Sequence, residues 1–351
     1  MTVYEPSLPE IPELTRAEQH LVTQTVRGEV ANFPADGDEP EAELKTIRPE
    51  VLQRLCANPS PEWPVRAHGV YMNGATISGD LDMGAAIIPH PLFLHDCSIA
   101  GRLILRDART RSIGLDGTSV QGISADRAVI EGALHLRIKF RATGEVRLLS
   151  AVIGGNFDCN GGVFEVKQGN ALDANRATVK GSVFLSLDFK ATGAVRLVGA
   201  EIGGDLNCIN GTFEAVDGIA LLAQRLTVEG SFFWSPKEVS GVVDLMHAQV
   251  GSLSDDSKAW PFLDSPNPEW RLDGFTYGAL APLSPIDSTF RSDWLAANST
   301  IDDGFAPQPY EQLIKVYRGM GHPAEARAIA FAKQEELRKS GNLKPLGWLW
   351  N

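Results

Sequence analysis

The sequence has no long apolar run, few cysteines and no basic excess, and each absence excludes a class of protein. No stretch approaches the ~18–20 consecutive apolar residues that a membrane-spanning helix needs, and the basic-then-apolar pattern of a signal peptide is missing. Four cysteines in 351 residues are too few for a disulfide framework, so we expect a cytoplasmic protein with reduced thiols. A formal net charge of −12 argues against a nucleic-acid partner.

What is present is an internal repeat. The segment FRATGEVRLLSAVIGGNFDC ends at Cys159, and FKATGAVRLVGAEIGGDLNC ends at Cys208, 49 residues later. The same offset relates ISADRAVIEG, LDANRATVKG and LLAQRLTVEG. A repeat of this size predicts a solenoid.

Within each 49-residue unit, a shorter pattern of alternating apolar residues, a small residue and a glycine occurs twice. Its copies begin at Val70, Leu92, Ile113, Ile123, Val146, Leu172, Val195, Leu221 and Val243. The alternation indicates strands with one side facing inward, and the small residue and the glycine indicate corners. Without helical segments between the strands, near-identical coils stack in parallel register.

The predicted fold is therefore mainly β: a right-handed parallel β-helix of about nine coils over residues 70–250. One apolar position of each coil should form a single inner row. Its expected members are Ile77, Ile99, Ile153, Val179, Ile202 and Val228.

The flanking segments predict helical ends. Residues 1–69 contain a helix over 14–33, with Thr15 and Glu18 as a capping box, an acidic linker and a helix near Pro49. Residues 251–306 indicate an irregular cap with a last strand and a short helix. Residues 307–351 indicate a helical hairpin similar to one tetratricopeptide unit, followed by a Trp-rich tail.

This combination resembles a bacterial group of pentapeptide-like right-handed β-helix proteins that is common in actinobacteria. Three features carry the resemblance: repeats of the type GEVRLLSAVIGGNFDC, the element RLDGFTY, and the hairpin APQPYEQLIKVYRGMGHPAEARAIAFAKQ. The resemblance covers nearly the whole chain from about Leu14. It implies the β-helix fold, and members are often labelled membrane-associated or "oxidoreductase".

Cofactor and metal chemistry find no support in the sequence. The pairs Gly154–Gly155 and Gly203–Gly204 lead from strand to strand, whereas a dinucleotide site needs a helix after its glycines. Cys159 and Cys208 fall two coils apart, too far for a disulfide. His90 and His95, near Asp96, match no metal spacing. We therefore expect no cofactor, no metal and no catalytic residues.

Two arginine sets share repeat positions and are candidates for a binding surface. Arg127, Arg176 and Arg225 predict an outward column with ~10 Å between members. Arg147 and Arg196 form a second pair. Such a column suits a carboxylate- or phosphate-bearing partner, whereas pairing with acids such as Glu131 and Glu229 would neutralise it.

The leading hypothesis is a non-catalytic scaffold that binds protein partners or itself. Its expected contact residues are the arginines and the C-terminal Tyr310, Tyr317, Trp348 and Trp350. One alternative is a binder or enzyme for an acidic polysaccharide along the arginine column, and another is attachment to the inner face of a membrane through the tail. DNA mimicry is disfavoured, because residues 70–250 hold 19 acidic and 16 basic residues and are nearly neutral.

Overall fold

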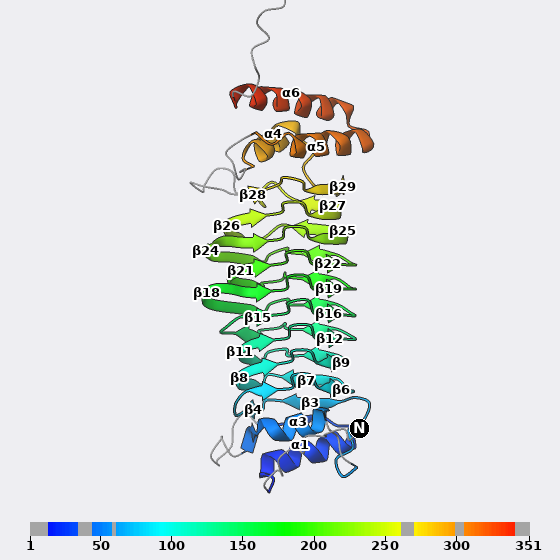
Figure 1. The fold of residues 1–351 in the computed structure, drawn as a ribbon, viewed down its shortest axis with the longest axis vertical. Coiled ribbons are helices and arrows are strands. Elements are labelled where there is room, and N and C mark those ends of the chain that lie inside the picture. The colour runs from blue at the N-terminus through cyan, green and yellow to red at the C-terminus, as the bar shows by residue number, and fades with distance from the viewer. Residues whose placement is uncertain (1–12, 34–43, 58–60, 261–269, 299–304, 341–351) are drawn as a thin grey trace, which may run out of the picture.

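The chain is a stack of β-coils closed by helices at both ends (Figure 1). The structure is a computed structural model and describes residues 13–33, 44–57, 61–260, 270–298 and 305–340. Within these residues it shows about nine turns whose strands pair only in parallel, which confirms the expected mainly β parallel solenoid with helical ends. Each turn has four sides, which we call walls A, B, C and D in chain order.

The strands of each wall stack directly on those of the neighbouring turns. Wall A contains β1 (Ala31–Asn32), β3 (Val70–Asn73), β7 (Leu92–His95), β10 (Ile113–Gly114), β13 (Leu134–His135), β17 (Phe157–Asp158), β20 (Val183–Phe184), β23 (Leu206–Asn207) and the later parts of β25 (Thr227–Trp234), β27 (Gln249–Asp255) and β29 (Thr276–Leu280). Wall B contains β2 (Thr46–Ile47), β4 (Thr76–Ile77), β14 (Arg141–Ala142) and the first parts of β8 (Ser98–Ile104), β11 (Ser119–Ser124), β18 (Val163–Asp173), β21 (Lys190–Arg196), β24 (Thr212–Leu222) and β26 (Glu238–Asp244). Wall C contains β5 (Leu81–Asp82), β15 (Val146–Arg147), β28 (Trp270–Arg271) and the later parts of the same long strands. Wall D contains β6 (Ile87–Ile88), β9 (Arg109–Thr110), β12 (Val129–Ile130), β16 (Val152–Ile153), β19 (Thr178–Val179), β22 (Glu201–Ile202) and the first parts of β25, β27 and β29.

The single inner row expected from the sequence is wrong, because its members occupy two walls. Ile77 pairs with Ile99 on wall B, whereas Ile153, Val179, Ile202 and Val228 pair on wall D. All six side chains are buried. The A–B and C–D corners use the same kind of turn, so one sequence pattern marks the first corner in early coils and the second corner in later coils.

Both of these corners turn on a residue with positive φ. The C–D corner uses Ala85, Asp107, Arg127, Ser150, Arg176, Gly199, Arg225, His247 and Gly274. The recurring glycines of the sequence pattern lie at the other corners and have ordinary φ values. They are needed because backbones stack closely there: a Cβ on Gly181 would lie 2.9 Å from the carbonyl carbon of Gly155.

The 49-residue period arises from alternating ring positions in the core. Phe140 and Phe189 come from the A–B corner, where the next wall B residue to face inward is alanine. In the other coils a glycine occupies the corner and Phe164 or Phe213 lies on wall B. The four rings stack in one column with centroids 5.3–5.5 Å apart. One unit of the repeat is therefore two coils of different design.

At the N-terminal end, α1 (Arg16–Arg27) and α3 (Pro49–Ala57) cover the first coil (Figure 1). The expected capping box of Thr15 and Glu18 is confirmed. The first helix ends at Gly28, in the left-handed region, and does not reach residue 33 as expected. The chain then forms β1, which pairs with β3, so the ladder begins before residue 70.

Glu18 also joins the two N-terminal helices, and this contact predicts a pH dependence. Burial would raise the pKa of the Glu18 carboxyl, but hydrogen bonds from Arg48, at 2.6 and 2.7 Å, and from backbone N–H groups lower it overall. The resulting stabilisation is present above the ordinary glutamate pKa of about 4.3 and is lost as pH falls through the lower folded pKa. We expect Glu18→Gln to lose roughly 1–3 kcal/mol at pH 7 and nothing at low pH, measured by urea unfolding of both proteins between pH 7 and 3. An equal difference at every pH would contradict this assignment.

At the C-terminal end, side chains of the helices replace a missing coil. The ladder continues past residue 250 through β28 and β29, and α4 (Ser288–Ala296), α5 (Gln308–Gly319) and α6 (Pro323–Lys339) follow (Figure 1). The Gln308 side chain accepts a hydrogen bond from Gly274 N–H at 2.9 Å and donates one to the Phe275 carbonyl at 3.3 Å. Gln312 donates to the Tyr277 carbonyl at 2.6 Å. These contacts satisfy backbone groups that an uncovered solenoid edge would leave open.

Candidate functional site

The arginine column expected from the sequence exists, at the C–D corner. Arg127, Arg176 and Arg225 are all exposed, and all have φ values of 55–56°. Backbone hydrogen bonds place Ser150 and Gly199 between them in the column, so successive arginines are two coils, ~10 Å, apart.

The three arginines differ in their partners. Arg127 forms a two-point ion pair with Asp107, both N–O distances being 2.7 Å, and this hydrogen bonding lowers the pKa of the Asp107 carboxyl. Arg176 and Arg225 have no side-chain hydrogen bond or ion pair with any described residue. The expected neutralising acid Glu131 pairs instead with Arg109 and Arg111, at 3.8 and 3.5 Å.

The two unpaired arginines flank a residue without a side chain. A Cβ on Gly199 would lie 3.9 Å from Cγ of Arg176. The Arg176 side chain therefore lies beside the Gly199 backbone of the next coil, where no side chain projects. In that same coil, Arg196 projects from wall C and has no acidic partner among the described residues. Arg147, the other member of its pair, is bound to Asp126 at 2.9 Å. We call Arg176, Arg196 and Arg225, grouped about Gly199, the arginine corner.

A hollow of about 350 Å³ adjoins the arginine corner on the outside of wall D, across the same three coils. Its lining consists of Thr178, Val179, Lys180, Glu201, Ile202, Gly203, Thr227 and Glu229. The hollow therefore offers one amine, two carboxylates and two hydroxyls, in the wall D strands that follow the arginine corner in each coil. Such a surface recognises charged and hydrogen-bonding groups rather than apolar ones.

The C-terminal residues expected at the surface are placed differently. Tyr310 and Tyr317 are 3% and 0% exposed. The Tyr317 hydroxyl donates to the Ile286 carbonyl at 2.8 Å, and burial raises its pKa to about 12. Expecting them on a contact surface was wrong, because the hairpin packs on the end of the solenoid. Trp348 and Trp350 lie outside the described residues.

A second polar cluster lies outside wall A, and the sequence reveals only part of it. His95 lies not with His90 but beside Tyr71, whose hydroxyl oxygen is 3.2 Å from His95 Nε2. Further along the wall, Arg137 bridges Asp116 and Asp158, with N–O distances of 3.0 and 3.3 Å. Stacking of coils brings these residues together from sequence positions ~20 apart. Because the Asp116 and Asp158 carboxylates are already paired with Arg137, we assign this cluster a stabilising role on wall A.

The described residues contain no group of three or more His, Cys, Asp or Glu side chains arranged to hold a metal ion. The four cysteines are free and buried. Burial raises the pKa of the Cys56 thiol to about 12 and that of Cys97 to about 11, which disfavours the reactive thiolate.

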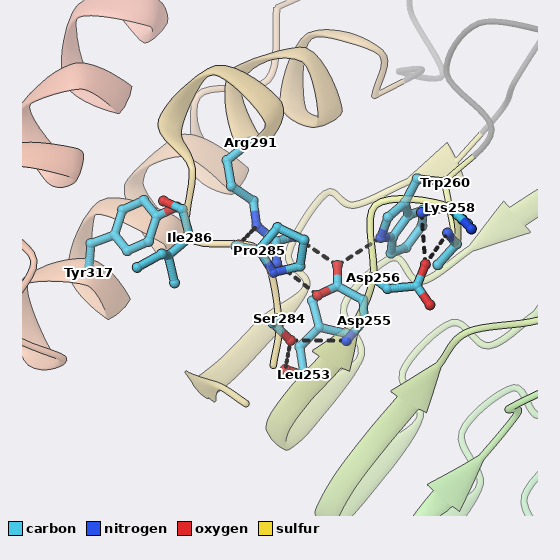
Figure 2. A network of polar contacts seen from close by, with 11 residues as sticks. Leu253, Asp255, Asp256, Lys258, Trp260, Ser284, Pro285, Ile286, Arg291 and Tyr317 are labelled. Atoms are coloured by element: carbon cyan, nitrogen blue, oxygen red, sulfur yellow. Dashed lines mark hydrogen bonds and ion pairs between the residues drawn. The ribbon is translucent and has the colours of Figure 1, made fainter. Parts of the chain in front are cut away.

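Among the ion pairs of the described residues, the most deeply buried one joins the last coils to the C-terminal helices (Figure 2). Arg291 on α4 donates to both carboxylate oxygens of Asp255 at 2.8 Å, and both side chains are 0% exposed. Trp260 Nε1 donates to the same carboxylate at 2.8 Å, and Arg291 Nε donates to the Pro285 carbonyl at 2.9 Å. Because three guanidinium N–H groups and both carboxylate oxygens are hydrogen-bonded and both side chains are fully buried, this network is a structural link.

Comparison of the chain with models of protein families, with curated proteins and with solved structures finds no match. Among the described residues, no helix combines the length and the apolar character needed to cross a membrane.

Proposed function

We propose that the protein is a non-catalytic, cytoplasmic scaffold of the pentapeptide-like type. In this proposal its arginine corner and wall D hollow bind an extended acidic segment of a partner protein. One observation carries it: Arg176 and Arg225 are exposed and unpaired within the described structure, although Arg127 at the same repeat position is bound to Asp107. Four buried free thiols support a reducing compartment.

The geometry of the corner suggests how such a segment would bind. The backbone positions of Arg176 and Arg225 are ~10 Å apart, which matches carboxylates three residues apart in a polyproline II peptide, since that helix rises ~3.1 Å per residue with three residues per turn. Lys180 would add a third cation beside the hollow. Glu201 and Glu229 on the hollow's surface would repel a uniformly anionic chain, which favours a peptide of mixed composition over an acidic polysaccharide.

Binding is tested with defined probes. We expect a fluorescent proline-rich peptide with glutamate at every third position to bind, and its affinity to fall with salt. The double variant Arg176→Ala/Arg225→Ala should weaken binding at least ~10-fold, because charge-assisted hydrogen bonds are lost. Arg127→Ala is the matched control and should leave the affinity unchanged, because its guanidinium is already engaged.

Three results would contradict the proposal. Equal binding of a peptide with lysine in place of glutamate would show that the corner does not select acidic side chains. Tighter binding of a polyuronate, lost in the same double variant, would favour the polysaccharide alternative. Absence of binding by both acidic probes would remove the arginine corner as a functional site. Membrane contact through the tail stays a separate prediction.

A further inference from the structure

The A–B corner, diagonally opposite the arginine corner, carries exposed apolar residues in a strained conformation. Ile138 and Leu187 are 59% and 62% exposed, and their φ values are 53° and 50°. They are 49 residues apart in the repeat. Gly161, in the coil between them, takes the same corner position.

Neither residue suits this corner in an isolated chain. Positive φ is disfavoured for a β-branched side chain such as Ile138 and for a bulky one such as Leu187, and an exposed apolar side chain gains no burial to offset that cost. Asn210, one coil beyond Leu187, shows that the corner accommodates a polar residue that tolerates this conformation. Ile138 and Leu187 are therefore the residues expected where another surface covers the corner.

The charges along the corner alternate about Gly161. Lys139 follows Ile138, and Asp188 follows Leu187. Asp96 lies three coils before Gly161, and the Pro236–Lys237 segment lies three coils after it. The four charged residues are exposed, and none forms an ion pair or side-chain hydrogen bond with another described residue. If this row of four charged residues is turned end to end about Gly161, each lysine falls at the level of an aspartate and each aspartate at the level of a lysine.

We propose that two copies of this chain pair through the A–B corner as antiparallel rods, with a two-fold axis at Gly161. Ile138 of one copy contacts Leu187 of the second copy, and Lys139 contacts Asp188. Asp96 faces Lys237 at the ends of the strip, which spans six coil spacings, ~29 Å. The same patch serves both copies, as a two-fold interface requires. The pairing leaves both arginine corners open and does not depend on the proposed function.

Sedimentation of the purified chain from about 1 to about 100 µM tests the pairing. We expect a dimer, and a monomer for Ile138→Asn/Leu187→Asn. The melting temperature of this variant should not fall, because asparagine tolerates positive φ. The dimer's Kd should rise about tenfold for Lys139→Asp or Asp188→Lys alone, because each change makes two symmetry-related contacts repulsive. The double reversal Lys139→Asp/Asp188→Lys should restore the wild-type Kd.

A monomeric wild type at the highest concentration would overturn the proposal. So would a dimer that survives Ile138→Asn/Leu187→Asn. A double reversal as weak as the single ones would show that these residues do not face each other and would overturn the antiparallel arrangement. Reversal of Lys167, an exposed lysine on the B–C side, is the control and should leave the Kd unchanged.

Discussion

Replacing Arg291 by methionine should lower the free energy of unfolding of the C-terminal end by about 3–5 kcal/mol. The substitution leaves the Asp255 carboxylate buried, with Trp260 Nε1–H as its one remaining donor among the described residues. The expected first effect is separation of α4 from the last coils (Figure 2). Urea unfolding followed by tryptophan fluorescence measures it directly, because Trp260 and Trp294 lie 5.4 Å apart at this junction.

Two further variants separate the ion pair from simple packing. The double variant Arg291→Met/Asp255→Leu removes both charges and should be more stable than Arg291→Met, because no buried charge is left unpaired. Arg327→Met, at an exposed position on α6, should change stability by less than about 0.5 kcal/mol. A single variant as stable as the wild type would mean that Asp255 is not held in a dry site.

The second large effect is expected from Phe189→Ala. The Phe189 ring is 0% exposed and lies between Phe164 and Phe213, with centroid distances of 5.3 and 5.5 Å. Removing it opens a cavity in the ring column and should lower the free energy of unfolding by about 3–5 kcal/mol. Hydrogen exchange should show the largest loss of protection in the coils of β18, β21 and β24, because coils of a solenoid interact mainly with their neighbours.

The matched control is Phe331→Ala on α6, where the ring is 73% exposed. We expect a change of less than about 0.5 kcal/mol for this variant. Equal effects of the two substitutions, or uniform loss of protection along the rod, would contradict the ring column as a local support.

The sequence alone identified the solenoid, because alternation and a 49-residue offset report inward faces and stacking without any knowledge of partners. It also located the capping box of Thr15 and Glu18, which depends on residues three apart. It missed the existence of two inner rows, because the A–B and C–D corners have the same local pattern. The alternation of Phe164 with Phe189 became visible only when the coils were stacked.

In the candidate site, too, the repeat spacing predicts some features, whereas others depend on how the coils and the helices pack. The column of Arg127, Arg176 and Arg225 follows from repeat spacing, so sequence could place it. Which arginine is free depends on acids one coil away, such as Asp107, 20 residues from Arg127. Burial of Tyr317 depends on how the hairpin docks on the solenoid, and no local pattern encodes that contact.

Distances between spin labels along wall D test most directly whether the coils stack in register over the whole rod. Arg109, Glu201 and Gln249 are exposed positions at one register of wall D, and the two later ones lie four and six coils from Arg109. Labels at Arg109→Cys with Glu201→Cys should be ~19 Å apart, and labels at Arg109→Cys with Gln249→Cys ~29 Å, measured in an excess of unlabelled protein. Two distances that fail to differ by ~10 Å would contradict the stacked solenoid and, with it, both proposed surfaces.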